Sequence, residues 1–125
     1  MNLRPVEIKA FVPAYDFALS KAFYEALGFE VPWSSEDLAY LRLGSTSFLL
    51  QANTSPEFAQ NFVMHMLVEN VDDWYRLVMS SNIPERFKVS VQVPQDQPWH
   101  IRDFPLLDPS GVLWRIGQNI PVQAQ

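Results

Sequence analysis

DQPWHIRDFPLLDPSGVLWRIGQ, residues 96–118, contains the most informative turn in the sequence. Residues 108–111, Asp-Pro-Ser-Gly, fit a type I turn, because such turns favour Asp at the first position, Pro at the second and Gly at the fourth. Side chains of the strand after the turn should alternate between its two faces. One face would carry Val112, Trp114 and Ile116, and the other Leu113, Arg115 and Gly117. The pattern predicts a β-hairpin in which one charged side chain, Arg115, lies in mid-strand on the less apolar face.

The rest of the chain predicts two runs of the same element order. Strands are predicted at residues 8–13, 29–32, 38–43 and 47–52 in the first half, and at 62–68 and 86–93 ahead of the hairpin in the second. One helix should begin after Asp16 and stop at Gly28, and another should begin near Asn70 or Asp72 and bury Trp74, Leu77 and Val78. Residues 53–60 form a linker in which one helical turn is expected near Ser55. Each half then reads βαβββ.

The spacing within the two halves supports an internal repeat. Lys9 precedes Asp16 by seven positions, and His65 precedes Asp72 by the same seven, so the halves align at an offset of 56 residues. Element order and this spacing, rather than sequence identity, carry the prediction.

Composition indicates a single folded domain and excludes several function classes. The 125 residues are 48% hydrophobic and include no cysteine, so a core can form without disulfides, and thiol catalysis is excluded. A net charge of −5 without a basic cluster argues against nucleic acid and anionic membranes as partners. The absence of a membrane-length apolar run and of a signal-like start predicts a cytoplasmic protein.

The order of the elements, together with FYEALGFEV, VENVDDWYRLV and FPLLDPSGVLWRIGQ, resembles the vicinal oxygen chelate superfamily. That superfamily includes glyoxalase I, extradiol dioxygenases, and the fosfomycin and bleomycin resistance proteins. The resemblance implies an α+β domain spanning 1–125, with two βαβββ modules, about 5–53 and 61–119, that form a curved mixed sheet around a cleft. It also implies a homodimer, often formed with exchange of a strand or a module.

Metal-using members of this superfamily place a His, a second His and a Glu where this chain has Lys9, His65 and Arg115. Ammonium and guanidinium groups have no lone pair for a metal at neutral pH, so we expect no metal and no cofactor. The metal-free bleomycin resistance branch carries a Pro-Trp-Gly stretch before its hairpin. Pro98 and Trp99 resemble it, whereas His100 stands in place of the Gly.

The sequence therefore predicts a metal-free protein that sequesters or senses a small, partly aromatic molecule. The expected ligand-binding residues are Lys9, Trp33, Tyr40, His65, Trp99, His100 and Arg115. An anionic group on the ligand could reach Arg115, whose alternative role is a local ion pair with a carboxylate. Trp99 is either a stacking residue or a core or interface residue.

Two other function classes stay open at this stage. The first is a lyase, isomerase or dioxygenase of the same fold that uses His65 with a nonstandard metal site or as an acid-base group. The second is a regulatory or interaction protein whose cleft is vestigial, because one fold hosts many activities.

Overall fold

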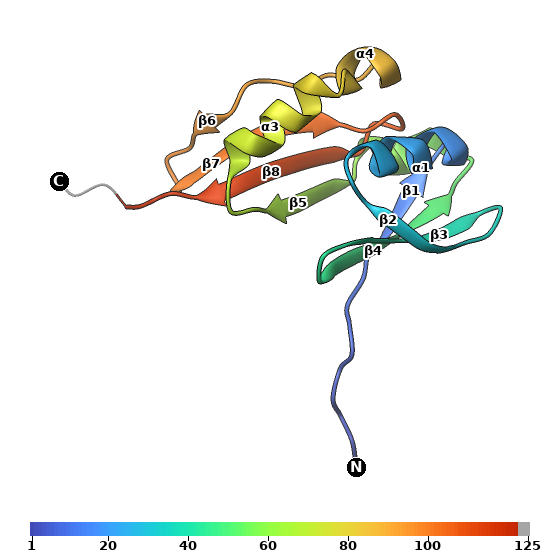
Figure 1. Cartoon of the computed structure of the whole chain (residues 1–125). Coiled ribbons are helices and arrows are strands. Elements are labelled where there is room, and N and C mark those ends of the chain that lie inside the picture. Colours follow the sequence, from blue (N-terminus) through green and yellow to red (C-terminus); the bar gives the residue numbers. More distant parts are fainter. Residues whose placement is uncertain (123–125) are drawn as a thin grey trace.

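The strands form two four-stranded sheets of identical connectivity in the computed structural model, which describes residues 1–122 (Figure 1). The first sheet runs in the order β1 (Phe11–Ala14), β4 (Thr46–Ala52), β3 (Leu38–Leu43) and β2 (Glu30–Ser34). The second sheet runs in the order β5 (Val63–Leu67), β8 (Leu113–Asn119), β7 (Ile101–Leu107) and β6 (Gln95–Asp96). In each sheet the first pair is parallel and the other pairs are antiparallel. The predicted α+β fold with two βαβββ units is confirmed.

Four helices accompany the sheets: α1 (Phe17–Ala26), α2 (Pro56–Gln60), α3 (Val71–Ser80) and α4 (Ile83–Phe87). In Figure 1, α3 and α4 lie over one face of the second sheet, and the N-terminal arm extends away from the body. None of the helices described within residues 1–122 is long and apolar enough to cross a bilayer.

The first helix begins and ends where the sequence predicts. The Asp16 carboxylate accepts a hydrogen bond from the Leu19 N–H at 3.1 Å, which satisfies one of the free donors of the first turn. Gly28, at φ +108°, follows the last turn, and the Phe29 N–H then bonds back to the Tyr24 carbonyl at 3.0 Å. Only glycine adopts this backbone conformation without a steric penalty, so Gly28 ends the helix.

A cluster of aromatic rings joins the two halves of the chain in the core. Trp114 of the second sheet packs against Tyr24, Phe29 and Phe48 of the first half, with ring centroids 5.3–6.2 Å apart. Each of these four side chains is at most 6% exposed. The alternation predicted for the last strand is confirmed, since Val112, Trp114 and Ile116 are all buried.

A buried polar network lies at the same junction. The Tyr24 hydroxyl donates to Asp108 and accepts a hydrogen bond from the Trp114 indole N–H at 2.8 Å. Asp108 also accepts from the Val112 N–H at 2.8 Å and from the Ser110 N–H at 2.9 Å, and the Gly111 N–H closes the predicted turn onto its carbonyl. Burial raises the pKa of Tyr24 well above its ordinary value, and burial likewise raises the pKa of Asp108.

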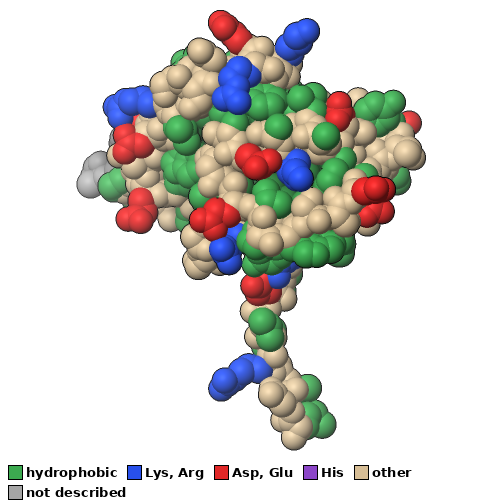
Figure 2. Space-filling view, turned by 45° about the vertical axis from the view of Figure 1, so that its right-hand side comes forward, with side chains coloured by type: hydrophobic (Ala, Val, Ile, Leu, Met, Phe, Trp, Pro, Cys, Tyr) green, Lys and Arg blue, Asp and Glu red, His purple; other side chains and the backbone are tan. Residues whose placement is uncertain are grey.

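The first strand is shorter than predicted. It begins at Phe11 rather than residue 8, and its ladder covers only Leu49–Ala52 of β4. Ile8 is 94% exposed, because the chain packs against the body only from Lys9 and Ala10 onward. Leu3 and Val6 in the same arm are also exposed. Figure 2 shows hydrophobic side chains on the surface of the extended arm.

The predicted strand at residues 86–93 is wrong. Ile83 and Phe87, four positions apart, are buried on one side of α4, and the strand of this unit is instead β6. Residues 90–92 run beside β7 and form a single isolated bridge, Val91 to Leu106. The Pro105 carbonyl accepts from the Gln92 N–H at 3.3 Å, but Pro105 has no N–H to return the second bond of a ladder.

The second long helix also differs in detail from the prediction. Its N-cap is Asn70, one of the two predicted starts, and the Asn70 side chain accepts from the Asp73 N–H at 3.0 Å. The N-caps Asp16 and Asn70 are therefore not related by the predicted offset of 56 residues. Val78 is buried and Trp74 packs against the core, whereas Leu77 is 37% exposed. The buried side of α3 is formed by Val71, Trp74, Tyr75 and Val78, and Leu77 lies outside it. The predicted burial of Leu77 is therefore wrong.

Candidate functional site

Three of the predicted site residues lie together on the first sheet. Trp33 and Tyr40 are cross-strand partners on β2 and β3, and antiparallel partners project from the same face. The Lys9 ammonium lies 5.2 Å from the centre of the Tyr40 ring, a cation–π distance, and also forms an ion pair with Glu7. Trp33 is 53% exposed. The structure thus presents an exposed Trp33 and a half-buried Tyr40 beside a cation.

His65 and Arg115 lie side by side on the second sheet, where they are partners in the parallel β5–β8 ladder. Their neighbours Trp114 and Ile116 are buried, so these two side chains project from the opposite face. Gly117 keeps this face open, because a β-carbon there would lie 3.5 Å from His65 Nε2 and 3.2 Å from the β-carbon of Asp103.

Asp103 is the residue that the sequence reasoning missed on this face. Its carboxylate is buried, accepts from Arg115 Nε at 3.1 Å and Nη2 at 3.4 Å, and accepts from Gln97 Nε2 at 3.0 Å. Arg115 therefore forms the local ion pair that was one of its two predicted roles. Counting residues back from the turn places Pro105 opposite Arg115 and Asp103 diagonal to it. The hairpin register alone could therefore have identified Asp103 as a neighbour of Arg115.

Trp99 and His100 lie in the loop between β6 and β7. Trp99 is 60% exposed, which excludes the core role that was its alternative. His100 has φ +64°, the left-handed conformation that costs most residues energy but suits glycine. The Pro-Trp-Gly stretch that this loop resembles has glycine at the same place, so His100 occupies a position whose backbone favours glycine.

A cavity of about 250 Å³ lies between the start of β4 and β5. Its walls are mainly apolar, with Phe29, Phe48, Met64, Met66 and Trp114 as lining residues and His65 and Ser47 among the polar ones. The volume is enough for one ring or a short chain but is below the usual range of pockets that enclose a drug-sized molecule. Of these lining residues, the sequence predicted only His65 as part of a binding site.

The predicted site residues therefore form three groups rather than one contact network. The first group is Lys9, Trp33 and Tyr40, the second is His65 and Arg115, and the third is Trp99 with His100. Among residues 1–122 the ion pairs of Lys9 and Arg115 are with Glu7 and Asp103, respectively, and not with a shared partner. Within that same range, no cluster of three or more His, Cys, Asp or Glu side chains could hold a metal ion. The face of the second sheet offers the His65 imidazole, the Arg115 guanidinium paired with Asp103, and nearby apolar surface, which suits binding.

Comparison with protein families gives one match that spans most of the chain. Residues 8–116 match the model described as Glyoxalase/Bleomycin resistance protein/Dioxygenase superfamily. A bleomycin resistance protein from Klebsiella pneumoniae is 29% identical over 112 residues, which cover 86% of this chain and 88% of the relative.

Comparison with solved structures gives the same neighbours. A bleomycin-binding protein solved in complex with bleomycin is 27% identical, with a TM-score of 0.78 over 92% of this chain and 99% of the other. The bleomycin resistance determinant encoded on the transposon Tn5 has a TM-score of 0.77 at 24% identity, covering 92% of this chain and 98% of that one. The second likeness supports the fold alone.

Proposed function

The chain belongs to the Glyoxalase/Bleomycin resistance protein/Dioxygenase superfamily, and from that premise we propose that it binds a bleomycin-type molecule and sequesters it without chemical change. The observation that carries this proposal is the likeness, over nearly the full length of both chains, to a protein solved in complex with bleomycin. Exposed Trp33 and Trp99 would supply the aromatic contacts such a ligand needs.

The residues at the expected metal-ligand positions support binding without a metal. Lys9 carries an ammonium, and Arg115 carries a guanidinium that is already bonded to Asp103. Neither group offers a lone pair to a cation, and both would repel one. His65 is left as a single imidazole on this face, which favours a role in contacting ligand over a role in holding a metal.

The Asp103–Arg115 pair also changes the ligand that we propose. Two of the three guanidinium nitrogens, Nε and Nη2, already donate to the buried carboxylate of Asp103. An anionic ligand would have to compete with that carboxylate for Arg115. The paired charges make this surface close to neutral, and the chain as a whole carries −5, so a cationic aromatic ligand is favoured over the anionic one that the sequence suggested.

We propose further that the binding cleft is completed in a homodimer. The cavity of about 250 Å³ that His65 lines is too small for a large ligand, and the exposed rings lie apart in the fold, Trp33 on the first sheet and Trp99 in a loop of the second. The arm exposes Leu3, Val6 and Ile8, while Val63 and Leu67 are exposed on β5, an edge strand of the second sheet. Burying such apolar side chains would favour association of two copies.

A fluorescence titration tests the function. Bleomycin added to the purified protein should quench tryptophan emission and saturate at one molecule per chain. Trp99→Ala should weaken binding by about two- to tenfold, because stacking on one ring contributes about 0.5–1.5 kcal/mol. Trp74→Phe on α3 is the matched control and should leave affinity unchanged. Saturable binding of an anionic aromatic compound, with none of bleomycin, would overturn the proposed ligand class.

Light scattering tests the dimer. The full chain at micromolar concentration should give twice the 14.4 kDa chain mass. Removal of residues 2–8 should shift the protein toward the monomer, because it deletes three exposed apolar side chains without touching the β1 ladder. A monomer of the full chain at that concentration would contradict the proposal.

A further inference from the structure

The loop that carries Trp99 is held to the body by few backbone hydrogen bonds. Its N-terminal side is β6, a strand of two residues that pairs with β7 alone. Within the loop, the Gln97 N–H donates to the Ile101 carbonyl at 2.7 Å and the His100 N–H donates to the Gln97 carbonyl at 3.2 Å. The His100 carbonyl accepts one more bond, from the Ile120 N–H at 3.0 Å. Such a short edge needs side-chain support to hold one conformation.

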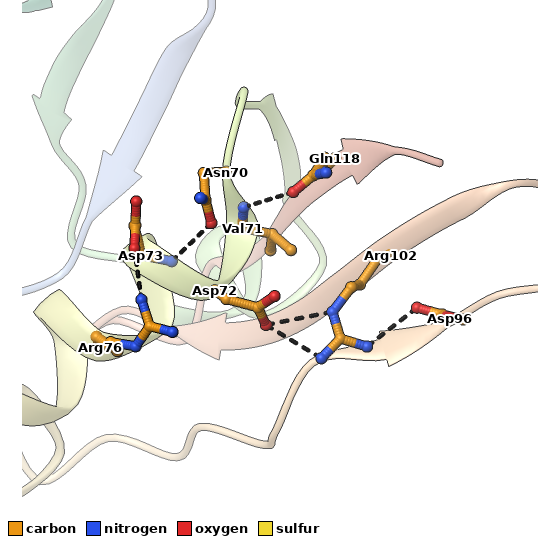
Figure 3. Close-up of polar contacts among 8 residues, drawn as sticks. All are labelled: Asn70, Val71, Asp72, Asp73, Arg76, Asp96, Arg102 and Gln118. Carbon is orange, nitrogen blue, oxygen red and sulfur yellow. Dashed lines mark hydrogen bonds and ion pairs between the residues drawn. The ribbon is translucent and has the colours of Figure 1, made fainter. Parts of the chain in front are cut away.

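Arg102 supplies that support on the helix side of the sheet (Figure 3). Its Nη1 donates to Asp96 of β6 at 3.0 Å, while Nε and Nη2 donate to Asp72 in the first turn of α3 at 3.2 and 3.0 Å. One guanidinium therefore bridges the strand that enters the loop to the helix that covers the sheet. Hydrogen bonding to Asp72, and then to Asp96, raises the pKa of Arg102 above its ordinary value, so the bridge is charged at neutral pH.

The next residue holds the same loop from the opposite face. Asp103 accepts from Gln97 Nε2 at 3.0 Å, and Asp103 is itself fixed by Arg115. Successive strand residues project to opposite faces, so Arg102 and Asp103 grip the two sides of the loop entrance. The helix end of the bridge is also fixed, because Gln118 accepts from the Val71 N–H at 2.9 Å (Figure 3).

From this arrangement we propose that Arg102 is a positioning residue for ligand binding: by bridging Asp72 and Asp96 it fixes the loop that presents Trp99. The inference rests on the proposed function for the role of Trp99, but the bridge itself is a property of the free protein. The Arg102 side chain is 31% exposed, and those of its partners Asp72 and Asp96 are more exposed. Because exposed ion pairs contribute little to stability, loss of the bridge should loosen the loop without unfolding the domain.

The test uses fluorine NMR of ligand-free protein labelled with 5-fluorotryptophan. The four tryptophans give separate reporters, and the Trp99 resonance is assigned by its loss in Trp99→Phe. In Arg102→Gln the Trp99 resonance should move toward the solvent-exposed position and sharpen, while that of buried Trp114 stays in place. Arg102→Lys, which keeps the charge but not the three-point bridge, should give an intermediate spectrum.

Arg76→Gln is the matched control. Arg76 forms an exposed ion pair with Asp73 in the same helix and has no hydrogen bond or ion pair to residues 97–100, so its loss should leave all four resonances unchanged (Figure 3). If Arg102→Gln does not fold, Asp96→Asn releases only the loop end of the bridge and should give the same change at Trp99. An unmoved Trp99 resonance in the folded variants would overturn the inference.

Affinity then separates this inference from the proposed function. If wild-type protein binds bleomycin, Arg102→Gln should raise Kd about threefold or more through faster dissociation, whereas Arg76→Gln should not change it. Equal Kd values for Arg102→Gln and wild type would overturn the positioning role. A wild type that binds no bleomycin would overturn the proposed ligand instead, and the spectra would still decide whether Arg102 fixes the loop.

Discussion

Tyr24→Phe removes a single hydroxyl from the junction between the two halves of the fold. That hydroxyl is fully buried, donates to Asp108 and accepts from the Trp114 indole N–H. The substitution leaves a buried carboxylate with one bond fewer and a buried N–H without its partner. A hydrogen bond to a charged group contributes about 1.5–3 kcal/mol and a neutral one about 1, so the free energy of unfolding should fall by about 2–4 kcal/mol.

Urea denaturation followed by circular dichroism and by tryptophan emission measures this loss. With a slope of about 1.5 kcal/mol/M, the midpoint should fall by about 1.3–2.7 M with an unchanged slope. Tyr75→Phe is the control, because the Tyr75 ring also packs in the structure but its hydroxyl has no hydrogen-bond partner among the described residues. A Tyr24→Phe midpoint equal to that of the control would refute the role of the network in joining the halves.

Two further predictions concern the same junction and the Trp99 loop. Burial raises the pKa of the Tyr24 hydroxyl above 10.0, so this hydroxyl loses its proton at a lower pH in the unfolded chain than in the folded one. The free energy of unfolding should therefore decrease as pH rises above about 10, and Tyr24→Phe should make that decrease smaller. The same dependence of unfolding free energy on alkaline pH in both proteins would contradict this. His100→Gly should raise the free energy of unfolding by about 0.5–1 kcal/mol, because removing the strain of the left-handed backbone outweighs the greater conformational entropy of glycine in the unfolded chain. Thermal melts measure this change. A lower melting temperature would show that the His100 side chain makes a compensating contact.

The sequence predicted the fold class well because its signals are local. The cap at Asp16, the stop at Gly28 and the turn at residues 108–111 each depend on the chemistry of a few neighbouring residues, and all three are as predicted. The strand predicted at residues 86–93 failed because Arg86 and Phe87 belong to α4, and because Pro105, which lies on a different strand, cannot complete a ladder with residues 90–92. Ladder formation depends on the partner strand, so one segment alone could not reveal it.

The binding role of the predicted site residues stays a prediction, but their exposure can be compared with the structure. Trp99, chosen because it lies at the end of a polar loop, is exposed, and so is Trp33. Arg115 was singled out from the sequence, but its partner Asp103 emerges only when the hairpin register is counted across two strands. The bridge through Arg102 depends on Asp72, which lies on a helix thirty residues away, and no local pattern marks that contact.

Isothermal titration calorimetry of chelator-treated protein with metal-free bleomycin tests whether this chain binds such a molecule without a metal of its own, as we propose. We expect saturable binding at one molecule per chain, with the same affinity before and after chelation, because Arg115 is paired with Asp103 and no cluster of metal-ligating side chains lies within residues 1–122. Binding that disappears on chelation and returns with added metal, or no binding of bleomycin under either condition, would contradict it.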